Sequence, residues 1–184
     1  MSGNTVQIGI HTAQFDTSHL GAFLTLVGLF ILGSFIGAIV MAKTGTWHLA
    51  LILAMEAAAV ATALTLDLTH GLPLATTAPL SFAMGAQNQL VVLVRGANPA
   101  TTFVTGTAFR LGDALAQRVM GRDPAGAWKL HLAVWASFAI GAASGTFSQL
   151  ELHQYALVPI LGLIVFLLVA ALATRIARPP RPAV

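Results

Sequence analysis

The sequence lacks cysteine altogether and has very few charged side chains. Without cysteine there are no disulfides, no thiol chemistry and no sulfur-ligated metal sites. Charged residues make up 8% of the 184 positions, against roughly 25% in ordinary soluble domains. Nine Lys or Arg and six Asp or Glu are too few to cover a water-soluble surface of this size. The composition therefore excludes a soluble enzyme, a disordered chain and a nucleic-acid-binding module.

Long apolar stretches take the place of charge, and 57% of the residues are hydrophobic. A bilayer core roughly 30 Å thick needs about 20 apolar residues in a helix. None of the stretches alternates with the period of two that marks a barrel strand. We expect an all-α, polytopic bundle of about five transmembrane helices, a single domain over residues 1–184 with a flexible Pro/Arg tail at 179–184. The five predicted spans are Leu20–Ala42, Trp47–Leu66, Thr76–Val94, Leu130–Ser148 and Tyr155–Thr174.

The positive charges predict the orientation, because cytoplasmic loops are enriched in Lys and Arg. With the N-terminus outside, residues 1–19, 67–75 and 149–154 face outward and contain neither residue. This arrangement predicts a multi-pass membrane protein with a cytoplasmic C-terminus. An outside N-terminus without a signal peptide also predicts a further N-terminal helix in the native chain. All nine positive charges fall inside: Lys43, Arg95, Arg110, Arg118, Arg122, Lys129, Arg175, Arg178 and Arg181.

Two pairs of segments resemble each other. Residues 2–9 match residues 105–112, and Phe30-x-x-Gly33-x-x-x-Gly37 matches Phe138-x-x-Gly141-x-x-x-Gly145. The predicted topology gives the copies opposite orientations, which is typical of inverted-topology repeats in transporters. We expect repeat one at about 1–75 and repeat two at about 76–178. Gly33, Gly37, Gly141 and Gly145 are predicted to be packing positions, within one chain or in a homodimer.

Three motifs together resemble the YoaK-type family of bacterial multi-pass membrane proteins of unknown function. They are residues 1–7 (MSGNTVQ), residues 83–88 (AMGAQN), and residues 101–107 (TTFVTGT) followed by Arg110-Leu111-Gly112. The similarity covers nearly the whole chain. It implies a plasma-membrane location, a suspected small-molecule transporter, and six helices of which the first precedes the Ser-Gly-Asn motif.

Glu56 is the most informative single residue, because it lies in the middle of the second predicted span. A carboxylate at the bilayer centre costs at least about 2.5 kcal/mol, so its side chain should face the bundle interior. It is predicted either to bind a coupling proton or cation, or to join two helices by a hydrogen bond. Gln87 and Asn88 lie in the middle of the third predicted span. Their amides suit a polar, uncharged or zwitterionic solute, and interhelical hydrogen bonding would equally explain them.

Two glycine-centred elements, Ser2-Gly3-Asn4 and Thr105-Gly106-Thr107, are predicted to interrupt helices. Glycine permits unusual backbone angles, and the flanking polar groups can satisfy freed backbone groups or cap a following helix. A helix N-terminus in a cavity would attract anionic or carbonyl groups, whereas the alternative is an ordinary capped loop at the surface. Residues 108–120 are amphipathic and predict a short interfacial or re-entrant helix.

The leading functional hypothesis is a transporter or channel for a small polar solute, not an enzyme. Glu56, Gln87, Asn88 and the two glycine-centred elements would line its cavity. The rival hypothesis is a structural or assembly protein that packs through its Gly-xxx-Gly helices. The six His form no HxxxH or HExxH pattern, so neither a metal nor a cofactor is expected. Membrane lipids are the other expected partners, and nucleic acid is not one.

Overall fold

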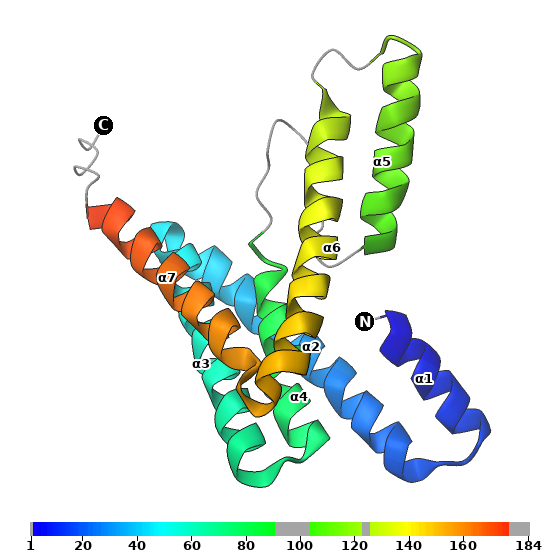
Figure 1. Cartoon of the computed structure of the whole chain (residues 1–184), viewed down its shortest axis with the longest axis vertical. Helices are drawn as coiled ribbons and strands as arrows, with labels where there is room; N and C mark the ends of the chain where they lie inside the picture. The colour runs from blue at the N-terminus through cyan, green and yellow to red at the C-terminus, as the bar shows by residue number, and fades with distance from the viewer. Residues whose placement is uncertain (1, 91–103, 123–125, 177–184) are drawn as a thin grey trace. The chain divides into compact units, whose positions relative to one another are not determined.

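The computed structural model describes residues 2–90, 104–122 and 126–176, and these residues form helices and short connections (Figure 1). The all-α prediction is therefore confirmed for this part of the chain. Two 3₁₀ turns, Gly45–Trp47 and His153–Tyr155, each precede a long helix. The helices are α1 (Ser2–Ala13), α2 (Thr17–Lys43), α3 (His48–His70), α4 (Pro73–Gln87), α5 (Val104–Val119), α6 (Ala127–Leu152) and α7 (Leu157–Ile176).

Four stretches of the described chain are helical, long and apolar enough to cross a membrane. They are Thr17–Lys43, Gly45–His70, Ala127–Tyr155 and Leu157–Thr174, and they coincide with four of the five predicted spans. Most of their large apolar side chains are exposed, including Ile31 on α2 and Phe166 on α7. A water-soluble fold would bury such side chains, whereas lipid solvates them. The chain is accordingly a helical membrane protein.

The third predicted span differs from the prediction. Its helix, α4, has 15 residues and a length of about 22 Å, less than the hydrocarbon thickness. The helix ends where the polar run Gln87-Asn88-Gln89 begins. The last turn tightens there, because the amides of Gln89 and Leu90 donate to the carbonyl oxygens of Ala86 and Gln87. Residues 91–94, the rest of the predicted span, lie outside the described residues.

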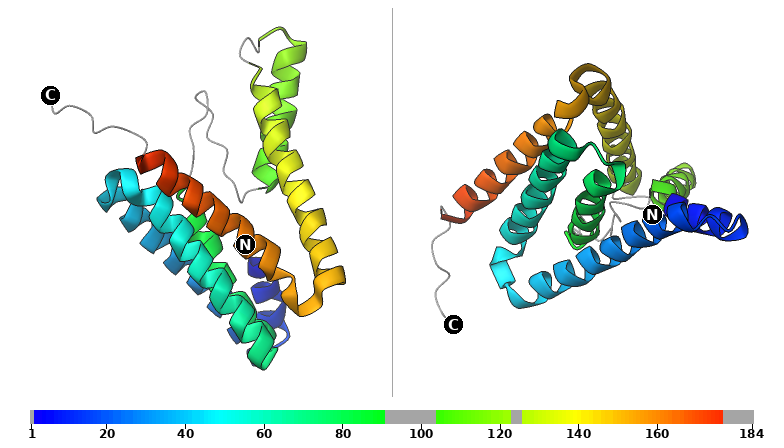
Figure 2. Two further views of the ribbon diagram at one scale, coloured as in Figure 1. Left: turned by 60° about the vertical axis from the view of Figure 1, so that its left-hand side comes forward. Right: turned by 90° about the horizontal axis from the view of Figure 1, so that it is seen from below.

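The chain divides into two compact units, and the larger contains α1 to α4 with α7 (Figure 2). In this unit α4 packs against both α2 and α3, α3 also packs against α7, and α1 packs against α2. Small side chains permit the contacts of α4, where Ala83 and Ala86 are buried. The core is thus narrow and formed largely by small residues with Ile52, Leu53 and Val60, while many other large apolar residues are exposed.

The second unit contains α5 and α6, which pack against each other. The amphipathic helix predicted at 108–120 is present as α5, which begins a few residues earlier, at Val104. Along the chain, the order of elements from α5 to α7 repeats the order from α1 to α3. A short helix, a long apolar helix, a 3₁₀ turn and a second apolar helix occur as α1 to α3 and again as α5 to α7.

Candidate functional site

Glu56 lies on the face of α3 that packs inside the larger unit. Its neighbours on this face, Ile52, Leu53, Ala59 and Val60, are all buried, and their spacing of three and four residues forms one stripe along the helix. Glu56 itself is 5% exposed. The structure thus places the carboxyl group near the middle of the apolar span Gly45–His70, on the side turned toward other helices.

The buried carboxyl group lacks a full set of hydrogen bonds. Glu56 Oε1 is inaccessible to solvent and has no hydrogen-bond partner among the described residues. Buried polar atoms in native structures are nearly always bonded, so an exception calls for a specific explanation such as a bound ion, water or solute. This atom is the clearest chemical feature of the apolar part of the molecule.

The amide run lies at the same depth as Glu56. The helices α3 and α4 are antiparallel and joined by Gly71 and Leu72, where Gly71 has a left-handed φ of 60°. Glu56 lies as many residues before the turn at Gly71 as Gln87 lies after the turn at Leu72. Because the two helices rise equally per residue, the end of α4 is level with the carboxyl group of Glu56. Gln87 is exposed there, and Asn88 is half-buried.

The side chain of the neighbouring Gln89 approaches α2. Its Cγ atom would lie 3.0 Å from a Cβ atom added to Gly37 of α2. Because Glu56 Oε1 is unpartnered in this part of the chain, none of the three amides donates to that oxygen. The carboxyl group of Glu56 and the three amides therefore lie at one depth, but no hydrogen bond joins an amide to Glu56 Oε1. The closing turn at Gln89 was not predicted, since periodicity does not show where a helix ends inside an apolar run.

The predicted packing glycines fall into two groups. A Cβ atom on Gly33 would overlap the carbonyl oxygen of Phe82, and one on Gly37 would lie 2.9 Å from the carbonyl oxygen of Ala86. Gly33 and Gly37 therefore let α2 approach the backbone of α4. Gly141 and Gly145 on α6 have no described atom within 4 Å of an added Cβ.

The glycine-centred elements both lie in the first turns of short helices. Ser2-Gly3-Asn4 begins α1, and Thr105-Gly106-Thr107 follows Val104 at the start of α5. Neither element interrupts a helix within the described residues. Thr107 is buried, whereas Gly3 is exposed. The two elements belong to different units.

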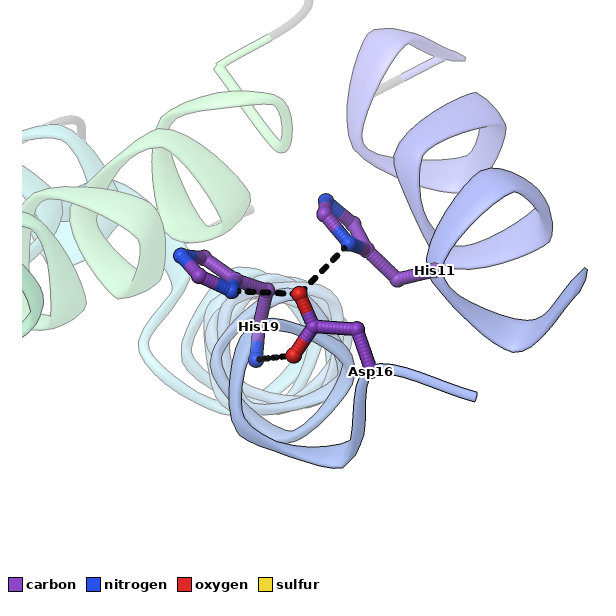
Figure 3. Close-up of side chains that lie close together, drawn as sticks. All are labelled: His11, Asp16 and His19. Carbon is purple, nitrogen blue, oxygen red and sulfur yellow. Dashed lines mark hydrogen bonds and ion pairs between the residues drawn. The ribbon is translucent and has the colours of Figure 1, made fainter. Parts of the chain in front are cut away.

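Sequence reasoning missed a polar cluster at the turn between α1 and α2, made by His11, Asp16 and His19 (Figure 3). Hydrogen bonds to Asp16 from the Ser18 hydroxyl and the backbone amide of His19 hold the pKa of this carboxyl group well below its usual range. The spacing His-x₄-Asp-x₂-His was the available signal. It is not a standard metal motif, and the turn that brings the side chains together was not predicted.

Comparison with known proteins gives one match. The family model described as "Protein of unknown function (DUF1275)" matches residues 1–171. No curated protein and no solved structure matches the chain. The resemblance to a family of unknown function is thus confirmed at the family level, whereas the narrower YoaK-type name rests on the motifs alone. With nearly its whole length covered, the chain belongs to the DUF1275 family.

Proposed function

We propose that this protein is a membrane transporter or channel for a small polar solute, with Glu56 as the site of a coupling proton or cation. The single observation that carries this proposal is the unpartnered Oε1 atom of a carboxyl group buried in an apolar span. Ionisable groups inside membrane spans are expensive, and they commonly mark ion or proton pathways. A bound cation, proton or solute would supply the missing partner.

The end of α4 supports the same proposal. A helix that stops within the apolar region places the negative end of its dipole there, and transporters use such ends to coordinate cations. Here that end lies level with Glu56, together with the amides of Gln87 and Asn88. The carboxyl group would take the cation, and the amides would hydrogen-bond the solute.

The repeated element order supports an inverted-repeat architecture. Each short helix with its glycine-centred element, Ser2-Gly3-Asn4 in α1 and Thr105-Gly106-Thr107 in α5, precedes a long helix with a Gly-xxx-Gly step. We place the protein in the bacterial plasma membrane with a cytoplasmic C-terminus, as the charge distribution and the YoaK-type motifs indicate. No enzymatic activity and no nucleic-acid partner are part of the proposal.

The second candidate function is assembly with another membrane protein or a second copy of the chain. One observation favours it: no described atom lies near the Cβ positions of Gly141 and Gly145. A small-residue step of this kind permits close contact with another helix in lipid.

The test is solute-induced stabilisation of the purified protein. Amino acids, sugars, polyols and nucleobases are screened by thermal unfolding in detergent at two pH values, since a ligand stabilises the state that binds it. Uptake of a hit into proteoliposomes is then compared for the wild type, Glu56→Gln and the matched control Glu151→Gln, whose carboxyl group is exposed. We expect Glu56→Gln alone to remove the pH dependence of uptake. Unchanged uptake and pH dependence in Glu56→Gln would overturn the coupling role, and no hit across the panel would favour assembly.

A further inference from the structure

The turn between α1 and α2 brings three metal-ligating side chains together on one small surface. His19 Nδ1 lies 2.7 Å from Asp16 Oδ2, and His11 Nδ1 lies 3.3 Å from the same oxygen. One ligand atom from each residue falls within 4.8 Å of the others. Figure 3 shows both imidazole rings turned toward the carboxylate. The cluster contains two histidines and one carboxylate, so its composition differs from that of the acidic clusters common on protein surfaces.

The backbone fixes this arrangement. Helix α1 ends in a Schellman pattern, in which the amide of Asp16 donates to the carbonyl oxygen of His11 and the amide of Phe15 donates to that of Thr12. Phe15 adopts the required left-handed conformation at φ 56°. The pattern places the side chain of the third-last helical residue close to that of the third residue after the helix. Here those two residues are His11 and Asp16.

The carboxylate is oriented so that one oxygen is directed at the two histidines. Asp16 caps α2, and its Oδ1 atom accepts from the Ser18 hydroxyl at 2.8 Å and from the His19 amide at 3.3 Å. Its Oδ2 atom faces the two imidazoles instead. Metal-binding carboxylates are typically held in this way by hydrogen bonds to their other oxygen.

The longer of the two distances to Asp16 Oδ2 suits a small divalent ion, whereas the 2.7 Å contact of His19 is a hydrogen bond that must open when the ion binds. A tetrahedral ion with bonds of about 2.0–2.1 Å keeps its ligand atoms about 3.3 Å apart, which is the separation of His11 Nδ1 and Asp16 Oδ2. His11 is held on one side by the ring of Phe23, with centroids 5.5 Å apart. Its Nδ1 atom is buried and, apart from the 3.3 Å ion-pair contact with Asp16, has no hydrogen-bond partner among the described residues.

We propose that His11, Asp16 and His19 bind a divalent transition-metal ion of the Zn²⁺ class through Nδ1, Oδ2 and Nδ1. The rings of His11 and His19 are stacked at 16°, so one must turn before both planes contain the ion. His19 is the ring that turns, because its side chain is 67% exposed. Three protein ligands leave a fourth position for water or a solute group. The bound ion cross-links α1 to the start of α2.

The test is metal titration of the full-length, tag-free protein in detergent. Zn²⁺ binding is followed by calorimetry, and Co²⁺ substitution is followed by the visible absorption of a tetrahedral site. The variants are Asp16→Asn, His19→Ala and the matched control His70→Ala, which removes an exposed histidine outside the cluster. Asparagine also caps helices well, so Asp16→Asn removes the anionic ligand and leaves the cap.

We expect one Zn²⁺ per chain in the wild type and in His70→Ala, with a rise in melting temperature on binding. Both cluster variants should bind at least tenfold more weakly and lose that rise. The absence of saturable binding to the wild type would overturn the site. So would equal affinities in all four proteins, which would place the ion elsewhere. His19→Ala alters only an exposed side chain and keeps the test valid if Asp16→Asn folds poorly.

Discussion

The Ser34 hydroxyl on α2 donates a 3.0 Å hydrogen bond to the carbonyl oxygen of Gly85 on α4. Gly85 lies in the last turn of α4, where carbonyl oxygens lack partners within the helix. The amide four residues later, that of Gln89, donates to Ala86 instead. Ser34 therefore satisfies a backbone group that the early end of α4 leaves free. A second hydrogen bond joins the same two helices: Ser81, about one turn before Gly85 on α4, donates at 2.7 Å to the carbonyl oxygen of Leu26 on α2.

Replacing Ser34 with alanine should weaken the joint between α2 and α4. Interhelical hydrogen bonds in membranes contribute about 0.6 kcal/mol on average and up to about 1.7 kcal/mol. We expect Ser34→Ala to lose about 1 kcal/mol in detergent unfolding, because the carbonyl group is part-buried. Thr25→Val is the matched control, since the Thr25 hydroxyl bonds only within α2 and is exposed. Equal losses in both variants would show that the hydrogen bond between the helices contributes nothing.

Substitution of Gly85 should be far more damaging. An added Cβ atom would overlap the carbonyl oxygen of Phe30 and lie 2.9 Å from the backbone nitrogen of Ser34. Both are backbone atoms, so the helices must move apart. Overpacking of this kind costs about 1–3 kcal/mol, and we expect Gly85→Ala to reach the upper end. Gly28→Ala, on the facing helix α2 and with no atom within 4 Å of the added Cβ, is the control and should be neutral or stabilising. Thermal unfolding in detergent distinguishes the two, and a neutral Gly85→Ala would contradict the close approach of α2 and α4.

The long helices could be predicted from the sequence because the signal for a span is large. Twenty residues almost without charge leave few alternatives to a membrane helix, and four of the predicted spans appear with their ends shifted by at most seven residues. The end of α4 could not be predicted in the same way. A continuous helix and a helix that ends within the span can have equally apolar sequences. Which of the two forms depends on hydrogen bonds that a neighbouring helix supplies.

Part of the candidate site could also be predicted, because burying a charged group in a membrane span has a large energetic cost. A carboxyl group in an apolar span must face the interior, so the buried position of Glu56 follows from solvation energy alone. The cluster at His11, Asp16 and His19 depends on a left-handed residue at Phe15. Phenylalanine gives no signal for that conformation, since glycine normally occupies it.

The predicted orientation can be tested directly, because the chain contains no cysteine. Single cysteines are introduced in place of His70, at the end of α3, and in place of Thr46, between α2 and α3; both positions are exposed. The positive-inside rule places His70 outside and Thr46 in the cytoplasm. An impermeant maleimide should label His70→Cys in intact cells and Thr46→Cys only after permeabilisation. The opposite labelling pattern would reverse the topology.

Phe15 should be a strained position. Its φ of 56° is left-handed, which costs an L residue about 1–2 kcal/mol, and its side chain is 90% exposed. Glycine loses about 0.5–1 kcal/mol in chain entropy on folding, so Phe15→Gly should yield a net gain of about 0.5–1 kcal/mol. Ala13→Gly, two residues earlier at the helical end of α1, should change stability in the opposite direction. Thermal unfolding of both variants tests this, and a loss in Phe15→Gly would mean that the exposed ring contributes more than the strain costs.

Glu56 should oppose stability in the protein without ligand. Its Oε1 atom is buried without a partner among the described residues, and an unsatisfied polar group costs about 1–3 kcal/mol. Methionine has a similar length and no such requirement, so Glu56→Met should raise the melting temperature while abolishing solute-dependent stabilisation. Glu151→Met, at an exposed carboxyl group, controls for the general effect of removing a charge. A stabilised but inactive Glu56→Met is the outcome expected of a functional carboxyl group, because sites held for activity commonly reduce stability. A marked drop in melting temperature would instead assign Glu56 to helix packing. Loss of the carboxyl group can lower stability only if that group makes stabilising hydrogen bonds in the wild-type protein.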